Sequence, residues 1–245
     1  MTYAHWLRDF EAEAERRRLW DDPPWGRGAQ LHPDVARSIQ RFQVGEAGDG
    51  ANLIAKAGGD DYAAAVRLFV AEEQNHARML EELLRAAGVP TIASHWSDAV
   101  FVRLRRALGL RLELMVLLIA EVVALRYYRA LRDGTADPLV TRVAGLILAD
   151  EERHVPFHCH RLRIGFATLG RPARAAVFGV WRLLLLGVTI TVTADHGRAL
   201  RRLGVGRLVF VADVLVAFEA ALARIRGEEP KPRHVPKRAR PRGLF

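Results

Sequence analysis

Apolar residues recur at the spacing of an α-helix along most of this chain of 245 residues. No segment shows the sustained alternation of apolar and polar residues that is typical of a half-buried strand. The pattern therefore predicts an all-α protein. After a short amphipathic stretch near residues 3–19, helices are predicted at about 34–57, 60–87, 109–132, 137–169, 172–203 and 206–226.

Glycine and proline mark the breaks between these helices, in "AGGDD", "RDGTADP" and "GRP". The segment that begins "AAGVPTIASHW" is long enough to cross from one end of a bundle to the other. Two helical hairpins joined by such a crossover are a known four-helix-bundle topology. The expected organisation is an N-terminal amphipathic segment and linker (1–33), a four-helix bundle (34–169), additional helices packed on it (170–226), and a basic, proline-rich disordered tail (227–245).

The most apolar segment is "VFGVWRLLLLGVTITVTADHG". Its uninterrupted apolar and threonine stretch, from Leu183 to Ala194, spans about 12 residues, whereas crossing a bilayer takes about 20. Arg182 interrupts a longer count. We expect a buried helix that covers the bundle, with a membrane-inserted or interfacial helix as the less favoured alternatives.

The net charge says little about partners. A formal charge of +9 and an isoelectric point near 10.6 would ordinarily suggest nucleic acid or a membrane surface. However, only three of the 37 basic residues are lysines, and the chain is rich in Ala, Leu, Val, Gly and Arg, as a GC-rich coding sequence would give. Neither partner is therefore favoured. The charged N-terminus and the lone Cys159 favour a cytoplasmic protein without a disulfide framework.

Two Glu-x-x-His pairs carry the candidate chemistry: Glu73 and His76 in "AEEQNHARML", and Glu151 and His154 in "LADEERHVPFHCH". Residues three apart share one face of a helix, so each pair presents a carboxylate and an imidazole together. A charged, solvated helix face would give the same spacing. The position of further glutamates decides between the two interpretations.

In an antiparallel helix hairpin, residues equally distant from the turn lie at the same height. Reflecting Glu73 through the centre of "GGDD" gives residue 46, which is Glu46. Reflecting Glu151 through the centre of "DGTADP" gives residue 120, one position from Glu121. Each Glu-x-x-His helix thus has a glutamate at matching height on its neighbour.

Four carboxylates and two imidazoles directed into a bundle core would be costly if left unpaired. Two metal ions would cancel that charge, and a mixed oxygen and nitrogen shell suits iron or manganese. One Glu from each of two helices, with Glu-x-x-His from each of the other two, is the di-iron or di-manganese carboxylate pattern. A solvated face is a poor alternative for Glu121, which lies in the apolar "LMVLLIAEVVAL".

With these residues the sequence resembles the ferritin-like non-haem di-iron carboxylate proteins, over about residues 34–169. The resemblance implies two iron ions, or manganese or a mixed Mn/Fe pair. One metal would be held by Glu46, Glu73 and His76 and the other by Glu121, Glu151 and His154, with Glu73 and Glu151 bridging.

The segment "DEERH" is also similar to the Asp-Glu-x-Arg-His motif of bacterial multicomponent monooxygenases. In those enzymes the aspartate supports a ligand histidine, so the resemblance makes Asp150 the candidate partner of His76. It leaves Arg153 to balance the carboxylate charge.

Several nearby residues are weaker candidates. Tyr128 lies two turns from Glu121 and is either a core residue or part of an electron or hydrogen-bond pathway. His158 lies one turn beyond His154 and could approach the site, although packing is the simpler explanation. Glycines in "VGEAGDG" would either allow close helix packing or leave space beside Glu46 for dioxygen or substrate.

The favoured function is an oxidoreductase that activates dioxygen or peroxide and oxidises a small organic molecule. A ferroxidase or peroxide scavenger resembling bacterioferritin or rubrerythrin, a hydroxylase of modified tRNA, and a metal-free helical interaction protein are the alternatives. The chain has no glycine-rich dinucleotide motif and no iron–sulfur cysteine cluster, so an external electron donor is expected. A homodimer is compatible with the sequence.

Overall fold

The structure is a computed structural model that describes residues 2–19, 21–96 and 109–228. Within these ranges every regular element is a helix, which confirms the all-α prediction. The helices are α1 (Tyr3–Leu19), the short 3₁₀ helix η1 (Trp25–Arg27), α2 (Pro33–Glu46), α3 (Ala51–Lys56), α4 (Asp60–Ala86), α6 (Leu110–Gly134), α7 (Pro138–Phe166), α8 (Arg171–Arg202) and α9 (Arg207–Arg226).

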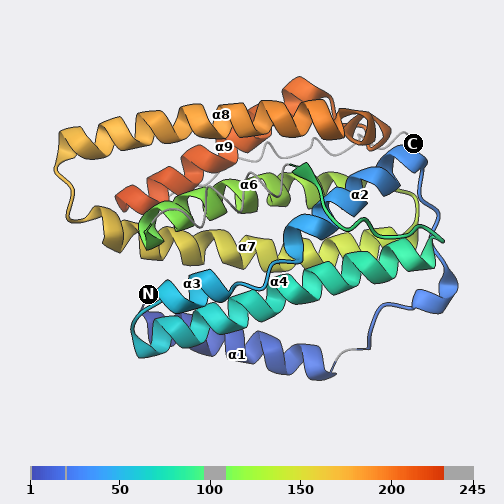
Figure 1. The fold of residues 1–245 in the computed structure, drawn as a ribbon, viewed down its shortest axis with the longest axis horizontal. Coiled ribbons are helices and arrows are strands. Elements are labelled where there is room, and N and C mark those ends of the chain that lie inside the picture. Colours follow the sequence, from blue (N-terminus) through green and yellow to red (C-terminus); the bar gives the residue numbers. More distant parts are fainter. Residues whose placement is uncertain (1, 20, 97–108, 229–245) are drawn as a thin grey trace, which may run out of the picture.

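The central helices are α2, α4, α6 and α7, with α2 packed on α4, α4 on α7, and α7 along most of α6. Helices α8 and α9 cover one side of this bundle, and α1 lies against α4 on the other (Figure 1). One apolar core runs through all of these helices and buries side chains such as Ile39, Leu80, Leu118 and Ile147. The predicted crossover between α4 and α6 falls mostly on residues 97–108, and the predicted tail on 229–245, both outside the described residues.

The helix predicted over residues 34–57 is in fact two helices. Helix α2 ends at Glu46, and α3 begins only at Ala51. Gly50 between them has φ +61°, and a Cβ there would lie 2.5 Å from the methyl groups of Val70. Glycine is poor at propagating a helix and tolerates this left-handed conformation, so the chain turns here instead of continuing.

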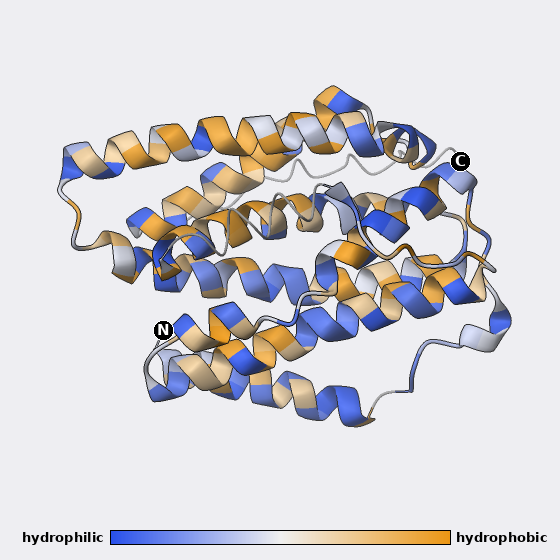
Figure 2. Ribbon diagram, in the orientation of Figure 1, coloured by the Kyte–Doolittle hydropathy of each residue, from blue (hydrophilic) through white to orange (hydrophobic). Residues whose placement is uncertain are grey.

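Helix α8 covers the bundle with one side only, so the expectation of a buried helix was wrong in this respect. Trp181 and Leu185 are buried against the core, whereas Leu183 and Val180 are 70% and 67% exposed. Hydrophobic residues occupy most of the helix length (Figure 2). By length and composition α8 could cross a membrane, and 22% of its most apolar window is buried.

Helix α1 spans the stretch at 3–19 that was predicted to be amphipathic. It buries Trp6 and Phe10 against the bundle, where both rings meet Phe157 of α7 at centroid distances of 5.7 and 5.1 Å. The next turn of its buried face carries Glu13, only 5% exposed. Glu13 thus places a carboxylate of α1 toward the middle of the bundle.

Candidate metal centre

Four helices bring the predicted carboxylates and imidazoles together. Helices α4 and α7 each present their Glu-x-x-His pair from a helix interior. Helix α6 carries Glu121 in its middle, and α2 carries Glu46 as its last residue. The heights inferred by reflection through the turns are therefore correct, although α2 and α3 are not continuous.

The six residues form two groups that share two glutamates. Within each group, one ligand atom per residue lies within 4.8 Å of all the others. The first group is Glu46, Glu73, His76 and Glu151, and the second is Glu73, Glu121, Glu151 and His154. Because Glu73 and Glu151 belong to both groups, the two positions lie side by side with these carboxylates between them.

The Nδ1 atoms of the two histidines point into this cluster. His154 Nδ1 lies 3.1 Å from Glu73 Oε1 and 3.4 Å from Glu121 Oε2. His76 Nδ1 lies 3.5 Å from Glu73 Oε1 and 3.6 Å from Glu151 Oε1. Both rings are fully buried, as is nearly all of Glu151.

The donor atoms of the cluster lack other partners, which makes the residues fit a metal pair. Among the described residues, five buried atoms here have no hydrogen-bond partner: Glu73 Oε1, His76 Nδ1, Glu121 Oε2, Glu151 Oε2 and His154 Nδ1. A buried polar atom left unsatisfied costs about 1–3 kcal/mol, and more if charged. Carboxylate oxygens and imidazole nitrogens gathered in this way are ligands suited to iron or manganese.

The opposite nitrogen of each histidine is held by a carboxylate from the other helix. His76 Nε2 lies 2.9 Å from Asp150 Oδ2, the contact that the sequence motif implied. His154 Nε2 lies 2.8 Å from Glu72 Oε2, a residue to which the sequence analysis gave no role. Such partners fix the orientation of a ligand histidine and keep the proton on the outer nitrogen. The signal for Glu72 was its position directly before Glu73, which repeats that of Asp150 before Glu151.

Two arginines bind these outer carboxylates. Arg153 Nη2 donates to both oxygens of Glu72 at 2.6 and 2.7 Å, and its Nη1 lies 3.1 Å from Asp150 Oδ1. Arg17 of α1 reaches the same two residues, at 2.8 Å from Glu72 Oε1 and 2.6 Å from Asp150 Oδ1. Arg153 was predicted from the sequence, whereas Arg17 was not, because no local motif links α1 to the bundle.

Without metal, burial disturbs the ionisation of the carboxylates. Burial raises the pKa of Glu46 to about 8, and the neighbouring Glu73 adds to the effect. Burial also raises the pKa of Glu151 well above its usual range, with repulsion from Glu121 as the next cause. Some of the carboxylates therefore hold protons in the metal-free protein at neutral pH.

The histidines respond in the opposite sense. Burial alone would lower the pKa of His76, but its contacts with Asp150 and Glu73 outweigh burial and raise the pKa to about 10. The carboxylates around His154 likewise overcome burial and raise its pKa well above the usual value. Protons thus occupy the cluster where metal ions would otherwise supply positive charge.

Two further predicted residues lie beside the cluster. Tyr128 Oη donates to Glu46 Oε1 at 2.6 Å, and the tyrosine is fully buried. His158 is also fully buried, with Nε2 3.6 Å from Glu121 Oε1. Neither nitrogen of His158 has a hydrogen-bond partner among the described residues. His158 therefore faces the second group instead of the surface.

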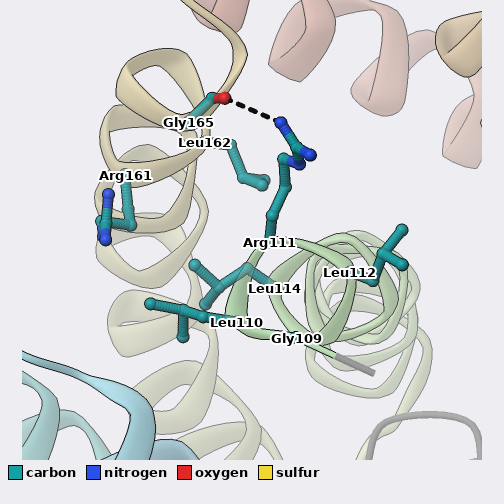
Figure 3. Close-up of a pocket in the computed structure, with 8 residues that line it drawn as sticks. All are labelled: Gly109, Leu110, Arg111, Leu112, Leu114, Arg161, Leu162 and Gly165. Atoms are coloured by element: carbon teal, nitrogen blue, oxygen red, sulfur yellow. Dashed lines mark hydrogen bonds between the residues drawn. The ribbon is translucent and has the colours of Figure 1, made fainter. Parts of the chain in front are cut away.

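A separate pocket of about 440 Å³ lies between the start of α6 and the end of α7. Leucines and two arginines line it, and Arg111 Nη1 donates to the carbonyl of Gly165 at 3.0 Å (Figure 3). None of the carboxylates and histidines of the cluster is among its lining residues. The pocket and the cluster are therefore distinct features of the α6–α7 pair.

Together, the helical bundle and the paired carboxylate and histidine groups define a ferritin-like di-iron protein. The chain belongs to the AurF family, described as p-aminobenzoate N-oxygenase AurF, whose model matches residues 55–224. This is a family of di-iron oxygenases that act on an organic substrate. No curated protein matches the chain.

The family match changes the extent of the resemblance found in the sequence. It includes α8 and α9, which the comparison with ferritin-like proteins over residues 34–169 left outside. It contains five of the six clustered residues, and Glu46 lies before its first residue. The family match therefore does not bear on Glu46 or on the α1 residues, whose place in the site is supported by the structure.

Proposed function

We propose that this protein uses two iron ions, bound by the two groups that share Glu73 and Glu151, to activate dioxygen and oxidise a small organic amine. The observation that carries the proposal is the set of buried, unpartnered donor atoms directed at two adjacent positions. An amine substrate follows from the description of the family, whose named member oxygenates the nitrogen of an aromatic amine.

In this function the chain's own residues hold the metals and exclude water. Glu73 and Glu151 would bridge the two positions, and His76 and His154 would each bind one ion through Nδ1. Asp150 and Glu72 keep the protons on the Nε2 atoms, so that the inner nitrogens are free to bind. Bound iron would supply the electrons with which dioxygen is reduced.

Aromatic side chains that surround the cluster, here called the aromatic shell, exclude water from it. Phe69 packs its ring edge-on against His154 and His158, with both centroid distances 4.7 Å. Phe10 of α1 faces His154 at 6.3 Å. A shell without exchangeable polar groups strengthens the electrostatic interactions inside it and limits side reactions with water. Electrons for repeated turnover would come from a separate donor.

The first test is metal content, measured by elemental analysis of protein from cells supplied with iron and manganese. The expected result is two ions per chain, mainly iron, with loss of cooperative loading in Glu121→Ala. The control is Glu152→Ala. Glu152 lies on the solvent-exposed face of α7, so metal loading should be unchanged. Full loading of Glu121→Ala would reject the ligand set, and absence of metal uptake would leave a helical interaction protein.

The second test is turnover. Iron-loaded protein is incubated with dioxygen, a chemical reductant and a panel of arylamines that includes p-aminobenzoate, and products are identified by mass spectrometry. Incorporation of ¹⁸O from labelled dioxygen into an amine supports the proposal. Oxidation of free Fe²⁺ or consumption of peroxide without a labelled product would identify a ferroxidase or peroxide scavenger instead.

A further inference from the structure

A series of contacting buried polar and aromatic side chains, called the line below, extends from the metal centre on the side of α2. It begins at Tyr128, whose hydroxyl contacts Glu46. The ring of Tyr127 lies 5.4 Å from that of Tyr128, and Phe42 stacks on Tyr127 with a centroid distance of 3.6 Å and an interplanar angle of 8°. Two easily oxidised rings are therefore adjacent, one of them touching a candidate ligand.

Beyond Tyr127 the line continues through hydrogen bonds between three helices. The Tyr127 hydroxyl of α6 is 2.9 Å from Ser38 Oγ of α2, and this Oγ is 2.7 Å from His196 Nδ1 of α8. Tyr127 is fully buried, and Ser38 and His196 are 2% and 7% exposed. Three polar side chains thus meet inside an otherwise apolar region.

The line ends near the surface. His196 Nε2 lies 3.4 Å from Asp195 Oδ2, and Arg41 Nη1 lies 2.8 Å from Asp195 Oδ1. The Asp195 and Arg41 side chains are 20% and 27% exposed, and His95 Nε2 approaches Asp195 at 3.7 Å. Asp195 Oδ2 has no hydrogen-bond partner among the described residues, so the hydrogen-bonded line from Tyr127 ends at His196, beside charged groups that reach solvent.

Each link is suited to moving a proton. Ser38 Oγ donates to the Tyr127 hydroxyl in the structure, but a serine hydroxyl has one donor and two acceptor sites and can rotate. After rotation, Ser38 accepts a proton from Tyr127 and gives its own to His196 Nδ1. Burial lowers the pKa of His196 to about 4; Arg41 and His95 act in the same direction, whereas Asp195 opposes them. The imidazole is consequently neutral and has a nitrogen lone pair available to accept a proton.

A buried tyrosine does not need such a hydrogen-bond network in order to pack in the core. Tyr62, another buried tyrosine, has no hydrogen-bond partner for its hydroxyl among the described residues and still packs in the core. By contrast, Tyr127 is linked to a serine and a histidine from two other helices. Buried polar networks of this kind are costly unless every member is satisfied.

From this geometry we infer that Tyr127, Ser38 and His196 form a proton-coupled electron-transfer site between the metal centre and the α2–α8 surface. The inference rests on the proposed function, since the oxidant is the iron pair after its reaction with dioxygen. Tyr127 loses one electron, which passes through the Tyr128 ring to the iron pair. The phenolic O–H bond of Tyr127 breaks, its proton moves to Ser38 Oγ, and the Ser38 proton moves to His196 Nδ1.

The products are a tyrosyl radical at Tyr127, an imidazolium at His196 and an iron pair reduced by one electron. An external one-electron donor then returns an electron to Tyr127, and the proton returns by the same route. The site would thus deliver electrons during turnover and remove oxidising equivalents when substrate is absent.

The test is electron paramagnetic resonance of iron-loaded protein mixed with dioxygen without substrate and frozen at successive times. We expect a tyrosyl radical that is lost in Tyr127→Phe and in Ser38→Ala, and that returns in Ser38→Thr, which keeps the hydroxyl. Tyr62→Phe is the matched control and should leave the signal unchanged. Iron content and circular dichroism, measured on each variant, identify any loss of the fold or the metals.

A photochemical experiment tests the outer half of the line without metal. A soluble ruthenium photo-oxidant with a sacrificial acceptor oxidises tyrosines, and radical formation at Tyr127 should slow in D₂O in the wild type and be lost in Ser38→Ala. A wild-type signal in Tyr127→Phe, or no effect of Ser38→Ala in either experiment, would overturn the inference. Two bound irons that react with dioxygen yet give no radical would overturn it as well and leave the proposed function intact.

Discussion

Glu72 holds His154 across the interface of α4 and α7, with 2.8 Å between Oε2 and Nε2. The matching contact between Asp150 and His76 has nearly the same length, 2.9 Å. Each motif thus supplies the support for the histidine of the other motif. Because of this exchange, neither half of the cluster is correctly oriented unless both helices are in place.

Glu72→Ala should weaken metal binding at the His154 position without removing any ligand. Loss of a carboxylate that orients a ligand histidine typically lowers metal affinity by about 10–100-fold. Calorimetric titration of metal-free protein with Mn²⁺ or anaerobic Fe²⁺ measures the change. Exposed Glu81→Ala on α4 serves as the control; equal affinities for the two variants would contradict the role assigned to Glu72.

Arg17→Ala should destabilise the protein although Arg17 lies outside the family match. Its guanidinium binds Glu72 and Asp150, both nearly buried, and hydrogen bonds to charged groups contribute about 1.5–3 kcal/mol. Arg153 keeps both carboxylates partly paired, so we expect the lower end of that range.

The neighbouring arginine provides the control for this prediction. Arg18 is 78% exposed and, within the described part of the chain, pairs only with Glu15, so Arg18→Ala should change the free energy of unfolding by less than about 1 kcal/mol. Urea unfolding of both variants gives the comparison. Equal losses would mean that α1 contributes only through its apolar face.

The metal-free protein should lose stability as the pH rises through neutrality. Glu46 has a folded pKa of about 8 against an ordinary 4.5, and His76 about 10 against 6.5. In both cases the folded state binds more protons than the unfolded chain between the two values, so stability falls as pH increases across that window.

Metal binding should reverse this dependence of stability on pH, because the ligands must lose their protons to bind. Thermal unfolding with and without metal at pH 6.5 to 8 should therefore show a difference in Tm that widens with pH. In Glu46→Gln the slope of the metal-free protein should decrease. A Tm difference that narrows with pH would show that the buried groups are not protonated as described.

Gly50→Ala should be destabilising and Gly45→Ala should not. Gly50 has φ +61°, and an added Cβ would clash with Val70, which predicts a loss of about 1–3 kcal/mol. Gly45 lies in α2 with no neighbouring atom within 4 Å of an added Cβ, so alanine there should stabilise by up to about 1 kcal/mol. Chemical denaturation tests both, and equal effects would contradict the packing role of Gly50.

Sequence periodicity and turn residues were sufficient to predict most of the helices and the heights of the candidate ligand residues along the bundle. Antiparallel hairpins keep equal distances from a turn at equal heights, which is why reflection located Glu46 and Glu121. The break after Glu46 was not predictable, since glycine within a helix and glycine ending a helix look alike in a single sequence. Contact between Gly50 and Val70 decides between them.

Residues that act across distant elements were hardest to predict. Arg17 meets Asp150 over 133 positions of sequence, and only the packing of α1 on α4 brings them together. The network of Ser38 and His196 likewise depends on α8 crossing α2. By contrast, Glu72 could have been predicted from the sequence, because both motifs have an acidic residue directly before the glutamate of the Glu-x-x-His pair.

The end of α2 makes the two halves of the metal centre unequal in their kinetics. Glu121 and both Glu-x-x-His pairs are fastened on either side by continuous helix, whereas Glu46 is the last residue of α2 and is followed by four residues outside any helix. Its backbone is held by helix on one side only, so Glu46 can shift without unwinding a turn. Metal exchange should consequently be faster in the His76 half, leaving the His154 half as the slow, anchoring site.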